Sequence, residues 1–200
     1  MALFWAALGF ISGSVPWSLM VGRLGLSRDI RDIGDHNPGA VNVFKTGSRI
    51  WGFVAVTLDI AKGAVPTYLA INLGSLETRE LVIVGLSPVF GSVFSPFLRF
   101  KGGKSLSVIG GVWIAMTGGL IFLVVLGFMG VFHGIQKTHC WTVLLGMMAV
   151  LVFMVITGME SYMVLMWSIC TAVAFFKHRT ELKHPVSFRR WIFVWRGGHS

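Results

Sequence analysis

The sequence predicts an all-α membrane protein with seven transmembrane helices, an N-terminus outside the cell and a cytoplasmic C-terminus. Hydrophobic residues make up 54% of the 200 residues and charged residues only 12%, against about 25% charged residues in soluble globular chains. Apolar runs of roughly 20 residues, the length of a membrane-spanning helix, recur along the chain. These runs lack the period-two alternation of strands. The basic residues gather in alternate loops, as they do in membrane proteins.

The apolar runs give the expected helices in chain order. Six runs are long enough, and they cover residues 2–21, 51–73, 81–98, 105–132, 140–156 and 159–176. The first run has no basic residue before it, so we expect a retained helix and not a cleaved signal peptide. The run 105–132 is expected to form two short helices broken at Thr117-Gly118-Gly119, because glycines interrupt a helical pattern. The total is then seven crossings.

The distribution of basic residues predicts the orientation. The chain carries 17 Lys and Arg against 8 Asp and Glu, and most of the excess falls in residues 22–50, 99–104 and 177–200. Loops rich in Lys and Arg stay in the cytoplasm, so residues 1–200 are expected to form one multi-pass domain of the cell (plasma) membrane. An outside N-terminus and an inside C-terminus require an odd number of crossings. The positive charge is typical of an anionic membrane face, and no nucleic-acid partner is expected.

The tail 177–200 combines basic and aromatic residues. Phe188, Trp191 and Trp195 lie three and four residues apart, with arginines beside them. This spacing predicts a short interfacial helix anchored by indole rings. The alternative is a disordered basic tail.

The segment Phe100-Lys101-Gly102-Gly103-Lys104-Ser105 is the strongest candidate for a functional loop. Glycines let a ligand approach the backbone, and free N–H groups at a helix start favour an anion. Lys104 adds a positive charge, so residues 99–104 are expected to bind phosphate. The spacing is not that of a Walker A loop. The alternative is an ordinary cytoplasmic loop with helix-breaking glycines.

The loop 22–50 is the second candidate. Its segment 34–45 is rich in turn-forming and amide residues and ends in Lys45. A connection of almost 30 residues is usually ordered for a function, although a capped connection into the second helix is the alternative. Inside that helix, Asp59 and Lys62 lie three residues apart. They either serve a function within the membrane or pair with each other.

No metal ion or cofactor is expected. The six histidines are scattered along the chain without the spacing of zinc ligands. The sequence also lacks the elbow motif of Ser/His/Asp hydrolases.

Five segments carry motifs in a defined order: Gly13-Ser14-Val15-Pro16, residues 34–45, residues 58–63, residues 97–104, and Lys177-His178-Arg179 with Glu181. They resemble, in the same order, the segments GS-[IV]-P, GSGNIGATNVxR, LDxxKG, FLxFKGGKG and RHxxN of a known family. This is the family of bacterial acyl-phosphate-dependent glycerol-3-phosphate acyltransferases, the PlsY family. The resemblance spans nearly the whole chain.

The resemblance implies seven membrane helices and an active site at the cytoplasmic face. It also implies transfer of a fatty acyl group from acyl phosphate to the 1-hydroxyl of glycerol 3-phosphate, which gives lysophosphatidic acid and phosphate. An acyl phosphate is already activated, so the reaction needs no covalent side-chain nucleophile. The protein then acts mainly by positioning and electrostatics.

The resemblance also indicates site residues. Lys104, Lys45 and His178 are expected to act in catalysis. Asp35 departs from the family pattern and is a candidate general base for a non-phosphorylated alcohol acceptor. The residues expected to bind substrate are Asn37, Gly39, Asn42, Gly102, Gly103, Ser105 and Glu181.

Several positions depart from the family pattern. Asp35 replaces a serine, Lys45 an arginine, Ser92 a histidine, Ser105 a glycine and Glu181 an asparagine. The two acids add negative charge beside the expected phosphate sites, unless they point away or pair with neighbouring cations. One alternative to the family activity is therefore an altered acceptor or lost catalysis on the same fold. A second alternative, a membrane transporter or lipid-binding protein, rests on the Asp59 and Lys62 pair inside a helix and on the broken run 105–132.

Overall fold

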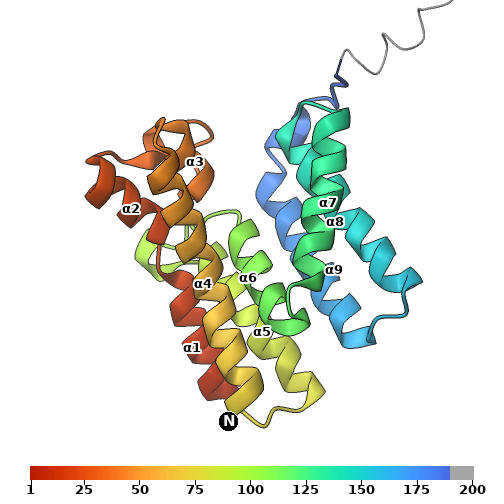
Figure 1. The fold of residues 1–200 in the computed structure, drawn as a ribbon. Helices are drawn as coiled ribbons and strands as arrows, with labels where there is room; N and C mark the ends of the chain where they lie inside the picture. Colours follow the sequence, from red (N-terminus) through yellow and green to blue (C-terminus); the bar gives the residue numbers. More distant parts are fainter. Residues whose placement is uncertain (190–200) are drawn as a thin grey trace, which may run out of the picture. The chain divides into compact units, whose positions relative to one another are not determined.

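The chain folds almost entirely into helices, as a computed structural model of residues 1–189 describes it (Figure 1). The α-helices are α1 (Ala2–Ser14), α2 (Trp17–Leu26), α3 (Ala40–Lys45), α4 (Arg49–Leu73), α5 (Thr78–Val93), α6 (Leu106–Thr117), α7 (Leu120–Ile135), α8 (His139–Ile156) and α9 (Ser161–His178). The 3-10 helices are η1 (Ile30–Asp32), η2 (Pro96–Leu98) and η3 (Glu181–Lys183). Within residues 1–189, β pairing is limited to one bridge between Gln136 and Phe188. The all-α prediction is confirmed.

The helices form two compact units, Met1–Leu120 and a second that begins at Ile121. In the first unit, α4 packs against α1, α2, α3 and α6, and α1 packs against α5. Small residues allow this close packing, as is usual between membrane helices. A Cβ added to Gly111 of α6 would overlap the Ile60 carbonyl oxygen of α4, and one added to Gly91 of α5 would overlap the Phe10 carbonyl oxygen of α1.

The first apolar run is broken, which corrects the expectation of one helix over 2–21. α1 ends at Ser14, Val15 is extended, and α2 begins at Trp17. Pro16 explains the break, because proline has no N–H and its ring clashes with the preceding helical turn. The loop also begins later than residue 22, because α2 continues to Leu26.

Buried polar groups stabilise this break. Lys62 of α4 donates from Nζ to the Val15 carbonyl oxygen over 3.0 Å. Lys62 also forms a 2.8 Å ion pair with Asp59, and the two side chains are only 6% and 9% exposed. Ser18 of α2 donates to the other Asp59 oxygen over 2.5 Å. Asp59 and Lys62 therefore pair with each other, and together they fasten both sides of the break to α4.

The predicted break in the run 105–132 is confirmed. α6 ends at Thr117 and α7 begins at Leu120. Gly118 and Gly119 have φ angles of 59° and 92°, in the left-handed region that glycine adopts without a steric penalty. The run 81–98 is also interrupted, because α5 ends at Val93 and a turn leads to η2.

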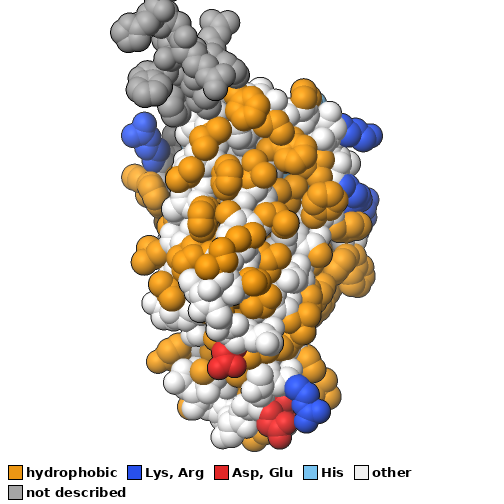
Figure 2. Space-filling model, turned by 90° about the vertical axis from the view of Figure 1, so that its right-hand side faces the viewer, with side chains coloured by type: hydrophobic (Ala, Val, Ile, Leu, Met, Phe, Trp, Pro, Cys, Tyr) orange, Lys and Arg blue, Asp and Glu red, His pale blue; other side chains and the backbone are white. Residues whose placement is uncertain are grey.

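Four described segments are long and apolar enough to cross a bilayer: Ala2–Leu26, Arg49–Leu73, Thr78–Leu98 and His139–Ile156. α6 and α7 are apolar but have only 12 and 16 residues. At ~1.5 Å per residue they are shorter than the ~30 Å hydrocarbon core. Figure 2 shows hydrophobic side chains spread over the viewed surface, with few acidic or basic side chains among them. The chain is a membrane protein, and the count of seven crossings stays a prediction.

The second unit contains α7, α8, α9 and η3. Trp167 of α9 is buried and donates from Nε1 to the Met147 carbonyl oxygen of α8 over 2.8 Å. Phe188 lies in the bridge with Gln136, so it does not begin the interfacial helix expected in the tail. The other two anchors of that helix, Trp191 and Trp195, lie outside the described residues.

Candidate active site

The two loops expected to bind substrate meet in the first unit. The Lys104 ammonium lies 2.6 Å from the Asp35 carboxylate, and the two side chains are 11% and 30% exposed. A Cβ placed on Gly103 would lie 3.3 Å from the Asn37 side-chain oxygen. Residues 69 positions apart in sequence are thereby joined in one half-buried polar cluster.

Local hydrogen bonds shape the first loop. Asp29 caps η1 by accepting from the Arg31 N–H over 3.0 Å, and Ile30 is fully buried beside it. α3 begins after Gly39, and Asn42 of α3 donates from its side chain to the Asn37 carbonyl oxygen over 2.8 Å. Turn formers and a buried anchor therefore explain why this long connection is ordered.

Gly34 allows Asn42 and Lys45 to approach the loop backbone. Gly34 has a φ of 65°, and a Cβ at this position would lie 2.6 Å from both the Asn42 Oδ1 atom and the Lys45 Nζ atom. Asn42 is 1% exposed. Its Oδ1 atom is buried and accepts no hydrogen bond from the described residues. A buried acceptor without a donor is costly, so this oxygen is a candidate to accept from a substrate hydroxyl.

The glycine loop is held against the end of α5. Gly102 donates from its N–H to the Val93 carbonyl oxygen over 3.1 Å, and a Cβ on Gly102 would overlap the Ser92 carbonyl oxygen. Arg99, Phe100 and Ser105 have φ angles of 52°, 63° and 61°. Non-glycine residues in this left-handed region concentrate at functional sites.

Ser105 and Ser92 are both buried where the glycine loop meets α5. Ser105 is buried, and its hydroxyl lies 3.5 Å from the Val89 carbonyl oxygen of α5. Ser92 is also buried in α5. The contact of Ser105 is thus with protein backbone, and its expected role in substrate binding stays a prediction.

Asp35 is ionised at neutral pH. Burial alone would raise its pKa, but the hydrogen bond and the positive charge of Lys104 outweigh burial and lower the pKa to about 2. The expected repulsion between Asp35 and a bound phosphate is therefore offset by its pairing with Lys104.

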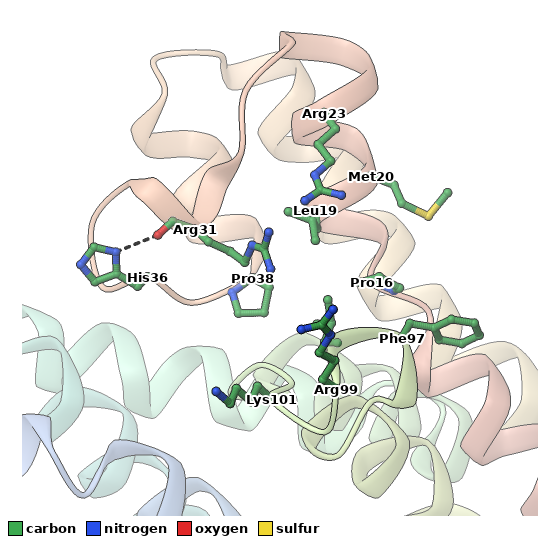
Figure 3. A pocket seen from close by; sticks show the side chains of 11 residues that line it. Pro16, Leu19, Met20, Arg23, Arg31, His36, Pro38, Phe97, Arg99 and Lys101 are labelled. Carbon is green, nitrogen blue, oxygen red and sulfur yellow. Dashed lines mark hydrogen bonds between the residues drawn. The ribbon is translucent and has the colours of Figure 1, made fainter.

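A cavity of ≈ 690 Å³ lies beside the cluster (Figure 3). One part of its lining is apolar: Pro16, Leu19, Met20, Pro38, Phe97 and Leu98. The other part is basic: Arg23, Arg31, His36, Arg99 and Lys101. The sequence places these basic residues in the two candidate loops and at the end of the first apolar run, but does not predict that they share one cavity. Their gathering depends on the turn after η2 and on the break at Pro16, which apolar runs do not reveal.

The remaining two predicted site residues lie in the second unit. His178 ends α9, is fully buried, and its Nδ1 atom lies 2.9 Å from the Ala174 carbonyl oxygen. Glu181 begins η3. Their participation in the site stays a prediction. Within residues 1–189, no group of three or more His, Cys, Asp or Glu side chains is arranged to hold a metal ion.

An apolar helical fold with a glycine-lysine loop packed against a second polar loop defines a helical membrane protein with a candidate anion site. The sequence family described as glycerol-3-phosphate acyltransferase matches residues 3–187. The chain therefore belongs to the glycerol-3-phosphate acyltransferase family, and the predicted resemblance is confirmed.

Curated relatives carry the same family name. A glycerol-3-phosphate acyltransferase of Trichlorobacter lovleyi is 41% identical over 130 residues, which cover 65% of this chain and 64% of the relative. One from Desulfovibrio desulfuricans is 35% identical, and the match spans 51% of its length. The chain thus spans less than two thirds of these two relatives. Glycerol-3-phosphate acyltransferase 1 of Thermotoga maritima is 32% identical, with 90% of this chain and 95% of the relative covered.

Solved structures share the fold. The crystal structure of PlsY, an integral membrane glycerol 3-phosphate acyltransferase, in its glycerol 3-phosphate form has a TM-score of 0.79 and 24% identity, with 97% of this chain and 98% of that chain covered. Its lysophosphatidic acid form also gives a TM-score of 0.79, at 22% identity.

Proposed function

We propose that this protein transfers a fatty acyl group from acyl phosphate to glycerol 3-phosphate, giving lysophosphatidic acid and phosphate. The observation that carries the proposal is the Lys104–Asp35 pair at the junction of two glycine-rich loops. Membership of the glycerol-3-phosphate acyltransferase family supports the same activity.

The reaction needs positioned charges more than a nucleophilic side chain. The acceptor hydroxyl oxygen attacks the acyl carbonyl carbon and forms an ester bond. The bond from that carbon to the phosphate oxygen breaks, and the phosphate leaves with the electron pair. One of the two phosphate groups takes the hydroxyl proton. Lys104, with the Gly102-Gly103 backbone, would stabilise the negative charge that develops on the leaving phosphate.

The first loop is suited to the acceptor. The buried Asn42 oxygen can accept from a glycerol hydroxyl, and Gly34 lets the Lys45 ammonium approach the same backbone. Lys45 would attract the acceptor phosphate as a point charge, without the bidentate grip of an arginine. Asn37 and Gly39 would hold the loop in this shape.

Asp35 acts in this proposal as the counter-ion of Lys104. A carboxyl group with a pKa of about 2 is a weak base at neutral pH. This property does not favour Asp35 as the general base for an altered acceptor. Asp59 and Lys62 form a structural ion pair. These two charged residues therefore no longer favour a transporter.

We also propose seven crossings, an N-terminus outside the cell, and an active site at the cytoplasmic face of the plasma membrane. The four long apolar segments, the short α6 and α7, and the 18-residue α9 together support this count. The basic loops that carry the site support the orientation. The family resemblance supports a role in catalysis for His178, at the end of α9, and a role in substrate binding for Glu181, in η3.

The activity is tested by phosphate release from acyl phosphate in membranes that contain the protein. We expect release with glycerol 3-phosphate and release near background with no acceptor or with glycerol. A preference for glycerol would indicate an altered acceptor. Release that does not depend on any acceptor would contradict acyl transfer.

A further inference from the structure

The cavity beside the active-site cluster adjoins both candidate loops, but the Lys104–Asp35 pair lies outside its lining. Its lining includes neither Asp35 nor Lys104, although His36 and Lys101 lie one and three residues from them in sequence. Figure 3 shows the Arg23 and Arg99 side chains extending toward each other from opposite sides, and Arg31 and Lys101 on the same flank as His36. The cavity therefore has its own arrangement of charge.

The positive charge in this cavity is only partly compensated. The Asp29 carboxylate is shared by Arg23 and Arg31 at 2.8 and 2.6 Å, and Asp32 adds a further electrostatic attraction to Arg31. Within residues 1–189, the side chains of Arg99 and Lys101 form no ion pair with an acid. A cavity whose four Arg and Lys side chains outnumber the carboxylates beside them attracts an anion.

The opposite wall of the cavity is apolar and partly exposed. Met20 and Phe97 line the cavity and are 37% and 64% exposed. Both side chains extend away from the basic flank in Figure 3. Exposed apolar side chains on a membrane protein contact acyl chains. The ligand that matches both walls has an anionic head and an apolar body.

We propose that this cavity binds the headgroup of an anionic diacyl phospholipid of the surrounding bilayer. The phosphate would lie between Arg99 and Lys101 below and Arg23 above, and the acyl chains would leave past Met20 and Phe97. Basic pockets beside membrane helices are the usual sites for anionic headgroups. Because His36 and Lys101 flank the two active-site loops, a bound lipid would hold both loops in place. The anionic lipid content of the bilayer would thus affect the positions of the two active-site loops.

The experiment measures lipid binding without turnover. The full-length protein, purified in detergent, is titrated with phosphatidylglycerol or phosphatidylcholine, and bound lipid is counted by native mass spectrometry. We expect phosphatidylglycerol to bind at least about tenfold more tightly. Equal binding of the two lipids would overturn the proposal. So would displacement of phosphatidylglycerol by glycerol 3-phosphate or inorganic phosphate, since the site would then be one for a soluble anion.

Variants connect the binding to this cavity. The double variant Arg99→Gln/Lys101→Gln is expected to bind phosphatidylglycerol about 30-fold more weakly, since each cation near an anionic lipid contributes about fivefold. The matched control Arg49→Gln/Arg79→Gln removes the same charge from outside the cavity and should bind like the wild type. If the first variant does not fold, Arg99→Lys/Lys101→Arg keeps the charge and should retain binding. Unchanged binding by Arg99→Gln/Lys101→Gln would contradict the proposal.

Discussion

The ion pair between Lys104 and Asp35 dominates the candidate site at the residue scale. A serine in place of Asp35 would match the family pattern. In this chain the Asp35 carboxylate pairs with the Lys104 ammonium, which is the group expected to bind phosphate. An incoming phosphate must therefore compete with Asp35 for Lys104.

Asp35→Ser is predicted to strengthen substrate binding. The change removes a negative charge within ionic contact of Lys104, so the KM for glycerol 3-phosphate or acyl phosphate should fall about tenfold, equivalent to about 1.4 kcal/mol. Steady-state kinetics with each substrate varied in turn measure the effect. A higher KM for both substrates would show that Asp35 binds substrate and does not merely hold Lys104.

The same pair predicts a pH dependence of stability. The pKa of the Asp35 carboxyl is lowered from the ordinary value of 3.8 to about 2 in the folded protein. The stabilisation from Asp35 is therefore complete above about pH 4 and is lost as the pH falls toward 2. The thermal unfolding midpoint of the wild type should exceed that of Asp35→Asn at pH 7, and the difference should shrink as the pH falls from 4 to 3. A constant difference would contradict the pairing.

Gly102 and Gly103 are neighbours with different constraints. A side chain at Gly102 would overlap the Ser92 carbonyl oxygen, whereas one at Gly103 would lie 3.3 Å from a movable side-chain oxygen of Asn37. Gly102→Ala is expected to reduce the free energy of unfolding by ~1–3 kcal/mol, and Gly103→Ala by clearly less. Thermal unfolding of the two purified variants makes the comparison. Equal losses would argue against the close contact with α5.

At the element scale, the break between α1 and α2 is held by α4. Asp59, Lys62 and Ser18 form a buried network around the Val15 carbonyl group. α2 contributes Arg23 and Met20 to the basic cavity, so this network also fixes one wall of the cavity.

Lys62→Met is predicted to be strongly destabilising, because it leaves the Asp59 carboxylate buried without its ion partner. Breaking a buried pair costs ~3–5 kcal/mol. The double variant Asp59→Leu/Lys62→Met removes both charges and should be more stable than Lys62→Met alone. Thermal unfolding in detergent distinguishes the two variants. A double variant less stable than the single one would show that the network has no net ion-pair character.

At the scale of the whole molecule, apolar runs predict most of the helices. The positions of α4, α8 and α9 follow from runs of apolar residues, and the break after α6 follows from Gly118 and Gly119. The break at Pro16 is missed because the residues on both sides are apolar, although proline is itself the signal. Hydropathy measures the free energy of transfer of side chains from water to lipid, so it does not report where a helix bends.

The candidate site is predicted less completely than the fold. The motifs indicate Lys104, Asn42 and the glycines, and these residues do come together with Asp35. The Lys104–Asp35 pair itself depends on a tertiary contact over 69 residues, which spacing along the chain does not reveal. The basic cavity is missed for the same reason, since its cations come from three separate segments.

We propose that Lys104 supports acyl transfer at the junction of the two loops. The most direct test compares the initial rate of phosphate release from acyl phosphate and glycerol 3-phosphate in membranes with equal amounts of wild type, Lys104→Ala and Lys137→Ala. Lys137 is an exposed lysine in the second unit and serves as the matched control. We predict a loss of at least about 100-fold for Lys104→Ala and a wild-type rate for Lys137→Ala. A wild-type rate for Lys104→Ala would contradict a role of Lys104 in acyl transfer.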